Sequence, residues 1–277
     1  MAPGELSIAA ASSALLGEPT NLVRVLSGGT HAETALISAS GRELVARRFP
    51  PGDKAVANEV RVLDRVSSLG ALVPQLVAYT DDTYPLIVTT KVEGHHPDPS
   101  LPPAAIAHEM GRMLAQLHAV SGAGLERSPK EPASSETAIA QAARRNPPGF
   151  DHSHNVLVHG DFWCGNAMWR GAQLVGVVDW SGAHSGPRGL DVSWCRQDLV
   201  LLGDTDAADV FLQAYERTSG VEVADLREWD LFSAAYADTK VETWAPNYSG
   251  IGRHDVTAEV LRARLNEWNA GLLRNAR

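Results

Sequence analysis

The stretch that most constrains this chain lies in its second half and reads VHGDFWCGNAMW, from Val158 to Trp169. Eight consecutive positions of it contain a histidine, an aspartate, a cysteine and an asparagine, all of them side chains that take part in chemistry. A hairpin-like segment follows and ends near Asp179. The stretch is therefore a metal site, a nucleophile with its base, or a loop that positions other groups.

A metal-dependent hydrolase is the first alternative, because His152 and His154 form an HxH pair shortly before His159. A metal site needs a defined number of ligands in a defined geometry. The later histidines His184 and His254 are isolated and supply no second pair. Surface histidines explain the HxH pair more simply.

Oxygen ligands for magnesium explain the stretch better. Cys164 has no base near it in the sequence, and we expect it to be a buried thiol. Asp161 and Asn166 stand five residues apart, and Asp179 closes the hairpin that follows. A carboxylate and an amide oxygen suit Mg²⁺, which keeps several waters and shares phosphate oxygens. A second carboxylate nearby can take the proton from an attacking hydroxyl group.

The apolar pattern changes character near residue 92. Before it, short apolar runs predict strands, and one amphipathic segment predicts a helix capped by Asp53. After it, apolar residues recur mostly at helical spacing. Residues 126–150 are polar and flanked by prolines, and we expect little regular structure there. The predicted strands are 21–26, 35–38, 43–49, 74–79 and 85–90, and the predicted helices are 53–68, 104–120, 204–220, 225–244 and 255–273.

These features together resemble the aminoglycoside phosphotransferase family, which consists of small-molecule kinases with a protein-kinase-like fold. The resemblance rests on His159-Gly160-Asp161, on the asparagine five residues after this aspartate, and on VVDW at 177–180. It covers about residues 20–245 and implies an α+β, bilobal fold. The implied lobes are a small β-rich nucleotide-binding lobe over 1–92, with a five-strand sheet, one helix and a short N-terminal helix, and a larger, mostly helical lobe over 93–277 with the catalytic loop and the acceptor site.

For the reaction, the resemblance implies ATP, with GTP as an alternative, and Mg²⁺ as cofactors. Asp161 is the expected catalytic residue, and Asn166 and Asp179 are the expected metal ligands. A glycine loop between the first two strands is expected to hold the phosphates, because its backbone N–H groups can approach them closely. The residues of this loop are Ser27, Gly28, Gly29 and Thr30.

A cation and an acid complete the expected nucleotide site. Only four of the 24 basic residues are lysines, and the third strand carries arginine where the family has lysine. Strand alternation favours Arg47 as the phosphate-facing cation, with Arg48 as the alternative. Glu59 lies on the inward face of the next helix and is expected to orient Arg47. The hinge whose backbone pairs with adenine is expected to consist of Thr90, Lys91 and Val92.

The remaining candidates support the loop or bind the acceptor. His159 and Asp191 match positions that brace the catalytic loop in similar kinases. From Asp191 onward the chain has 15 acidic against nine basic residues, and acids attract polyamines. Asp238 and Glu242 are expected on one helix face, where they repel each other unless a cation joins them. The candidate acceptor-binding residues are Trp194, Asp198, Asp238, Glu242 and Trp244.

The predicted function is transfer of the γ-phosphoryl group of ATP to a hydroxyl of a small, cationic acceptor. An aminoglycoside or a basic peptide antibiotic of the viomycin–capreomycin kind fits, and the reaction would give antibiotic resistance. The alternatives are a metabolic kinase for an amino sugar, a choline-like amino alcohol or homoserine, and a nucleotide-binding pseudokinase, which the arginine at position 47 favours.

The overall charge narrows the choice of partners. A formal charge of −9 argues against nucleic acid and against anionic membranes as partners. The two cysteines have no CxxC spacing, and no apolar run reaches membrane-spanning length. We therefore expect a cytoplasmic enzyme, as a monomer or homodimer, whose partner is a small hydroxylated molecule.

Overall fold

The computed structural model describes residues 6–26, 32–127, 133–150 and 154–274. The chain divides into two compact units. The first comprises Met1–Glu93 and Gly176–Ser181, and the second comprises Gly94–Val175 and Gly182–Arg277. Asp179 therefore belongs to the same unit as the N-terminal sheet.

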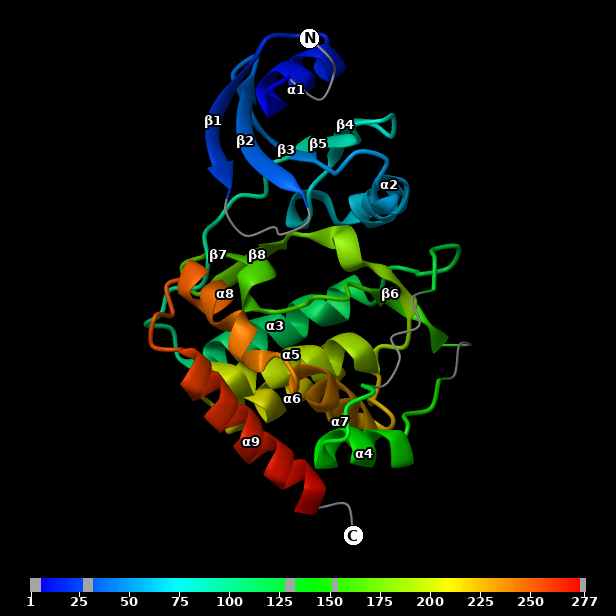
Figure 1. Ribbon diagram of the computed structural model, residues 1–277, viewed down its shortest axis with the longest axis vertical. Coiled ribbons are helices and arrows are strands. Elements are labelled where there is room, and N and C mark those ends of the chain that lie inside the picture. Colours follow the sequence, from blue (N-terminus) through cyan, green and yellow to red (C-terminus); the bar gives the residue numbers. More distant parts are fainter. Residues whose placement is uncertain (1–5, 27–31, 128–132, 151–153, 275–277) are drawn as a thin grey trace. The chain divides into compact units, whose positions relative to one another are not determined.

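A five-stranded antiparallel sheet forms the centre of the first unit (Figure 1). Its strand order is β1-β2-β3-β5-β4, so the third strand lies in the middle of the sheet. Each of the five predicted strands is found within two residues of its expected bounds. The strands are β1 (Thr20–Leu26), β2 (Glu33–Ala39), β3 (Arg42–Arg48), β4 (Leu76–Thr80) and β5 (Leu86–Thr90).

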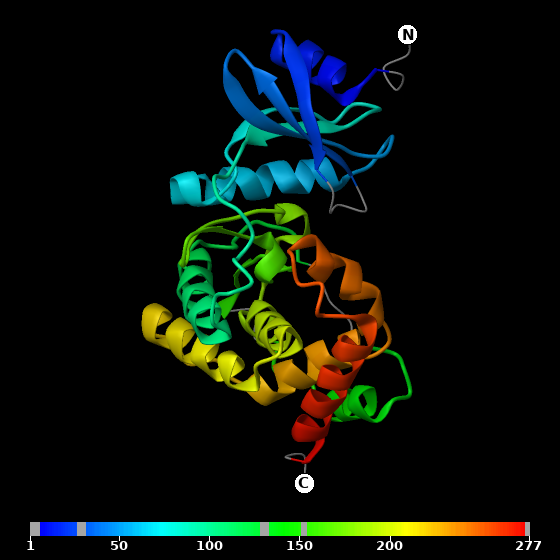
Figure 2. The ribbon, with the colours of Figure 1, turned by 90° about the vertical axis from the view of Figure 1, so that its left-hand side faces the viewer.

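Two helices pack on opposite sides of this sheet (Figure 2). α1 (Ile8–Leu16) buries Ile8 in an apolar cluster with residues of the central strands. α2 (Ala55–Val66) packs against β4 and β5 and buries one face, on which Glu59 lies. Asp53, predicted as the cap of this helix, accepts a hydrogen bond from the backbone N–H of Ala55 at 2.7 Å, but the N-cap residue is Lys54, whose side chain forms no capping bond.

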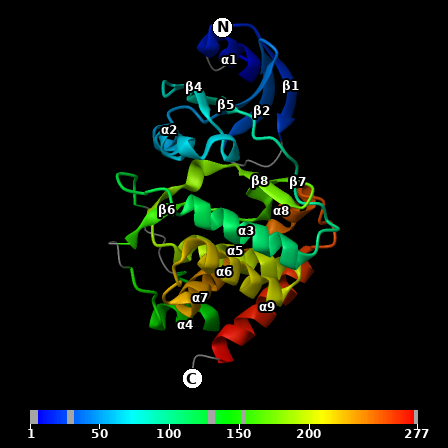
Figure 3. The same cartoon turned by 180° about the vertical axis from the view of Figure 1, so that it is seen from behind.

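The second unit consists mainly of helices (Figure 3). α3 and α6 pack so closely that a side chain at Gly111 would collide with the backbone of Phe211. α5 contacts α3, α6, α7 and α9 and is buried over nearly its whole length. The helices are α3 (Pro103–Leu117), α4 (Ala138–Arg145), α5 (Gly189–Leu202), α6 (Thr205–Ser219), α7 (Leu226–Ala237), α8 (Ala245–Gly250) and α9 (Ala258–Arg274).

Four short strands lie on either side of residues 159–166, and two of them form the hairpin predicted after these residues. β6 (Val156–Val158) pairs antiparallel with β9 (His184–Gly186). β7 (Ala167–Arg170) and β8 (Gln173–Val177) form the hairpin. Across the described ranges, no helix combines the length and the apolar character needed to cross a membrane.

Four helical segments differ from the predictions, and one of them is the short α8, which was not predicted. Residues 126–150 contain α4, which buries Ile139 and three alanines. The helix predicted over 225–244 is wrong beyond Ala237, because the backbone leaves helical geometry at Lys240 (φ −149°, ψ 1°) before a 3₁₀ turn over Val241–Trp244. α5 is a full helix that the sequence patterns did not predict.

Candidate active site

The loop over residues 159–166, which is the expected catalytic loop, brings Asp161 and Asn166 together. It connects β6 to β7, and a 3₁₀ turn over Cys164–Asn166 tightens its second half. The side-chain Nδ2 of Asn166 donates to the backbone oxygen of Asp161 at 2.9 Å and to its Oδ2 at 3.1 Å. The amide therefore holds the carboxylate in place with its nitrogen and leaves its oxygen, Oδ1, as the atom that can face a cation.

Asp191 braces the start of this loop from α5. Its carboxylate accepts the backbone N–H groups of His159, at 2.6 Å, and Gly160, at 2.9 Å. Gly160 has φ 83°, and a Cβ there would collide with the backbone of Gly182, so only glycine fits this turn. Asp191 thus fixes the backbone directly before Asp161.

A buried chain of hydrogen bonds lies behind Asp191. His118 donates from Nε2 to Asp191 at 3.2 Å and accepts the hydroxyl of Tyr215 at Nδ1, at 2.8 Å. Arg188 donates to the same hydroxyl oxygen at 2.7 Å. Burial lowers the pKa of His118 and would raise that of Asp191, but hydrogen bonds from His118 and from the loop backbone bring the pKa of Asp191 below its usual value. At neutral pH the pair is therefore a neutral imidazole next to an ionised carboxylate.

Asp198 holds the second half of the loop in the same way. It accepts the backbone N–H of Cys164 at 3.1 Å and the hydroxyl of Tyr248 at 2.7 Å. Asp191 and Asp198 lie two turns apart on α5 and so share a face of the helix. Burial raises the pKa of Asp198, and the bonds from Tyr248 and Cys164 offset this only partly. The two acids fix the loop on both sides of Asp161.

In the first unit, Arg47 lies between Glu59 and Asp179. Its guanidinium forms an ion pair with the buried Glu59 and lies 3.3 Å from Oδ1 of Asp179. Ser181 donates to the same oxygen at 2.8 Å. Asp179 has φ 62°, a left-handed conformation that aspartate tolerates better than most residues. The third-strand arginine, the helix acid and the acid after the hairpin thus form one cluster.

Replacing Arg47 with methionine should destabilise the protein more at high pH than at low pH. Burial raises the pKa of Glu59, and the charge of Arg47 opposes this shift. Without Arg47 the pKa of Glu59 rises further, so the folded state retains a proton that the unfolded state has already released. Stability is then lost as pH rises through this raised pKa. We expect the free energy of unfolding to fall by about 3 kcal/mol at pH 8 and by less at pH 5.

Urea unfolding of Arg47→Met at both pH values measures this difference. Arg42→Met is the matched control, because Arg42 pairs with Glu18 on the surface and should cost less than about 1 kcal/mol. An Arg47→Met loss that is the same at pH 5 and pH 8 would show that Glu59 does not depend on the arginine for its charge.

The other candidate nucleotide-binding residues that the structure describes form ion pairs or hydrogen bonds within the first unit or are buried in it. Arg48 pairs with Glu33 and donates to the backbone oxygen of Leu6, on the α1 side of β3 and away from the cluster of Arg47. Thr90 and Gln75 exchange two hydrogen bonds, and Lys91 pairs with Glu43 at 2.8 Å. Val92 is buried. The glycine-loop candidates Ser27, Gly28, Gly29 and Thr30 lie outside the described residues.

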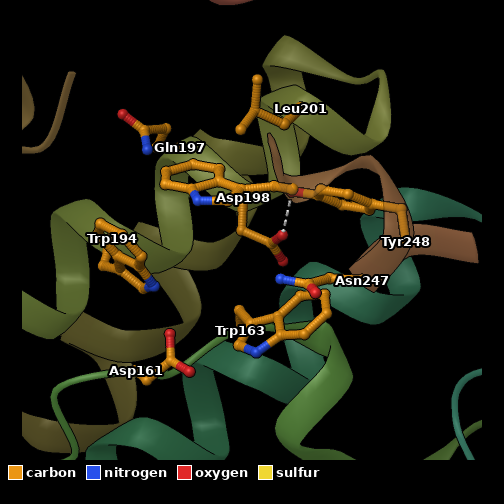
Figure 4. Close-up of a pocket in the computed structure, with 9 residues that line it drawn as sticks. Asp161, Trp163, Trp194, Gln197, Asp198, Leu201, Asn247 and Tyr248 are labelled. Atoms are coloured by element: carbon orange, nitrogen blue, oxygen red, sulfur yellow. Dashed lines mark hydrogen bonds between the residues drawn. The ribbon is translucent and has the colours of Figure 1, made fainter. Parts of the chain in front are cut away.

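A small, open pocket lies beside Asp161 in the second unit (Figure 4). Four residues spaced i, i+3, i+4 and i+7 on α5 form one wall, and the catalytic loop and the α8 region supply the others. The pocket contains three of the candidate acceptor residues, Trp194, Asp198 and Trp244. It also contains five that the sequence did not indicate for this role: Trp163, Gln197, Leu201, Asn247 and Tyr248.

The other two acceptor candidates, Asp238 and Glu242, interact with the chain itself. They do not share a helix face, because α7 ends at Ala237, directly before Asp238. Arg262 on α9 contacts both, at 3.3 Å from Oδ1 of Asp238 and at 2.6 and 2.7 Å from the two carboxylate oxygens of Glu242. This contact lowers the pKa of Glu242 to about 2. The cation expected to join these acids is therefore supplied by Arg262, and the prediction of a shared acid face for a ligand was wrong.

The side-chain donor atoms of the candidate metal ligands indicate which metal ion they could bind. Within the described ranges, no three or more histidine, cysteine, aspartate and glutamate side chains form a group that could hold a metal ion. His152 of the HxH pair lies outside those ranges. The Oδ1 atom of Asn166 and the carboxylate of Asp179 are hard oxygen donors of the kind that Mg²⁺ prefers beside phosphate. These two residues therefore fit magnesium better than zinc.

Several solved protein structures have an architecture similar to that of this chain. A macrolide 2'-phosphotransferase from Brachybacterium faecium is 21% identical, with 92% of this chain and 95% of that chain covered and a TM-score of 0.62. A spectinomycin phosphotransferase crystallised with ADP and spectinomycin is 13% identical, with 94% of this chain and 95% of that chain covered and a TM-score of 0.64. A choline kinase from Streptococcus pneumoniae is 15% identical, with 90% of this chain and 95% of that chain covered and a TM-score of 0.59.

These structural similarities confirm the predicted α+β, protein-kinase-like fold, with an antiparallel sheet in the N-terminal part and helices in the C-terminal part. A family model described as "Phosphotransferase enzyme family" matches residues 22–232, which is most of the chain. This chain belongs to the APH phosphotransferase enzyme family.

Proposed function

We propose that this protein transfers the γ-phosphoryl group of ATP to a hydroxyl group of a small molecule, with Mg²⁺ as cofactor. The observation that carries the proposal is the position of Asp161, which lines a pocket and is held there by Asn166. In this role Asp161 orients the acceptor hydroxyl and receives its proton during in-line transfer. The braced backbone on both sides keeps the carboxylate in one position, which is what catalysis by positioning requires.

The nucleotide side of the proposal uses the residues that the sequence indicates for nucleotide and metal binding. Arg47 contacts the phosphates, Glu59 fixes the direction of Arg47, and the hinge backbone over residues 90–92 pairs with the base. Asn166 and Asp179 hold Mg²⁺, which when bound neutralises charge on the phosphate oxygens. The glycine-loop candidates over residues 27–30 remain part of this proposal.

The biological role of the reaction is proposed only as a broad class of acceptor. The compared proteins are named for macrolides, spectinomycin and choline, so the fold serves both antibiotics and metabolites. We propose phosphorylation of an antibiotic as the leading role and a metabolic kinase as its alternative. A pseudokinase is the less supported choice, because Asp161, Asn166 and Asp179 are all present.

A screen of hydroxylated acceptors with MgATP tests the proposed function. The expected result is acceptor-dependent release of ADP together with an equal amount of a phosphate monoester, detected by ³¹P NMR. Binding of MgATP without acceptor-dependent ADP release across aminoglycosides, macrolides, amino sugars and amino alcohols would favour a pseudokinase instead.

A further inference from the structure

The acids proposed to attract a polycation are already engaged within the chain. Asp238 and Glu242 share Arg262, and neither lines the pocket. Asp198 does line it, but both of its carboxylate oxygens accept hydrogen bonds and it is 5% exposed. The pocket lining, which lies wholly within the described residues, contains one further acid, Asp161. A ligand with several positive charges would therefore find few carboxylates to pair with.

Aromatic rings make up much of the lining instead. The rings of Trp194 and Trp244 meet edge to face, with centroids 5.5 Å apart. On another side Trp163 meets Tyr248 in the same way, at 5.6 Å. Trp163 also folds over Gly165, where a Cβ would collide with the indole, so the loop itself fixes this ring. Fixed indoles offer flat apolar surfaces at little entropic cost.

The polar groups of the lining suit hydroxyls rather than charges. Asn247, which is exposed, and Gln197, which is buried, carry amides, which donate and accept hydrogen bonds but bring no net charge. Figure 4 shows both amides, with Asp161 and Trp194 on the other side of the labelled group from Tyr248. A pocket with aromatic walls and a few orienting polar groups is typical of small-molecule sites.

We infer that the acceptor is a hydroxylated ring compound, of the glycoside type, that carries at most one positive charge at this pocket. The C–H face of such a ring stacks on the indoles, a hydroxyl reaches the exposed amide of Asn247, and the reacting hydroxyl lies at Asp161. This inference rests on the proposed function and narrows its acceptor. It also assigns to Trp194 the role of a specificity-determining residue.

A matched pair of acceptors tests the inference. Neamine, a polyamino disaccharide, and its fully N-acetylated form share their rings and differ in positive charge. We measure acceptor-dependent ADP release and, with MgADP bound, acceptor binding by tryptophan fluorescence, both in low and high salt. We expect the acetylated form to bind and react at least as well as the free amine, with less than about a twofold change on adding salt, because screening weakens only charged contacts.

Variants of Trp194 separate stacking from a merely structural role. Trp194→Leu should lower kcat/KM for the ring acceptor by about tenfold, which corresponds to the loss of about 1.4 kcal/mol, while the KM for MgATP stays unchanged. Trp194→Phe should recover most of the loss. Phe150→Leu is the control, because Phe150 is an exposed aromatic residue that is not part of the pocket lining.

The possible results with neamine and its N-acetylated form distinguish failure of the inference from failure of the proposed function. A preference of tenfold or more for the free polyamine, lost in high salt, would overturn the inference and leave the phosphotransferase function standing. Absence of ADP release with both forms would count against the proposed function, and the fluorescence titration would then decide between the ring and the polycation. Failure of both forms to bind would overturn the inference for glycoside rings.

Discussion

Asp161→Asn should lower turnover by about 10²–10⁴-fold, the usual contribution of a positioned acid–base group, and should leave the affinity for MgATP within about twofold. Asparagine has nearly the same shape as aspartate but cannot take a proton from the acceptor hydroxyl. The loop keeps its position, because its supports are the backbone contacts of Asp191 and Asp198. Single-turnover product formation and calorimetric titration with MgATP measure the two quantities.

Asp206→Asn is the matched control for this variant. Asp206 is an exposed acid at the start of α6, outside the site, and its replacement should leave the rate unchanged. Near-normal turnover of Asp161→Asn would reject the role assigned to Asp161. A parallel loss of MgATP affinity would instead show that the carboxylate acts on the nucleotide.

Asp191→Ala should have the largest effect on stability, about 3–5 kcal/mol in the free energy of unfolding, as is typical when one member of a buried charged network is removed. The change leaves the N–H groups of His159 and Gly160 without their acceptor and deprives His118 of its partner. Buried donors without partners are costly. Turnover should fall as well, because the backbone before Asp161 loses its support.

Equilibrium unfolding in urea measures the loss, with Asp206→Ala as an exposed control expected to change stability by less than about 0.5 kcal/mol. Asp191→Asn should fall between the two, since an amide retains one acceptor oxygen. If Asp191→Ala unfolds at the wild-type urea midpoint, the hydrogen bonds to the loop do not support it energetically.

Much of the fold could be predicted because its signals are local. The five strands have short apolar runs bounded by turns, and their positions were right to within two residues. α5 was missed because it is buried on nearly all sides, so it has no polar face and no helical period to detect. α4 was missed because its buried face is mainly alanine, a weak apolar signal within a polar segment.

The candidate site was likewise predictable only where its residues lie close together in the sequence. The spacing of Asp161 and Asn166 predicted a pair that the 3₁₀ turn and the amide hydrogen bonds do bring together. The partner of Asp198, by contrast, is Tyr248, fifty residues further along the chain. Arg262 likewise reaches Asp238 and Glu242 from another helix. Contacts of this kind depend on tertiary packing, which no local pattern encodes.

Binding of Mn²⁺, in place of Mg²⁺, together with ADP is the most direct test, because the proposed reaction requires that Asn166 and Asp179 both support binding of the metal–nucleotide complex. Electron paramagnetic resonance titration should show that Asn166→Ala and Asp179→Asn each weaken Mn²⁺ binding by at least about tenfold, the scale of loss known for perturbed metal sites. ADP binding without metal should stay unchanged in both. Wild-type Mn²⁺ affinity in either variant would contradict the account.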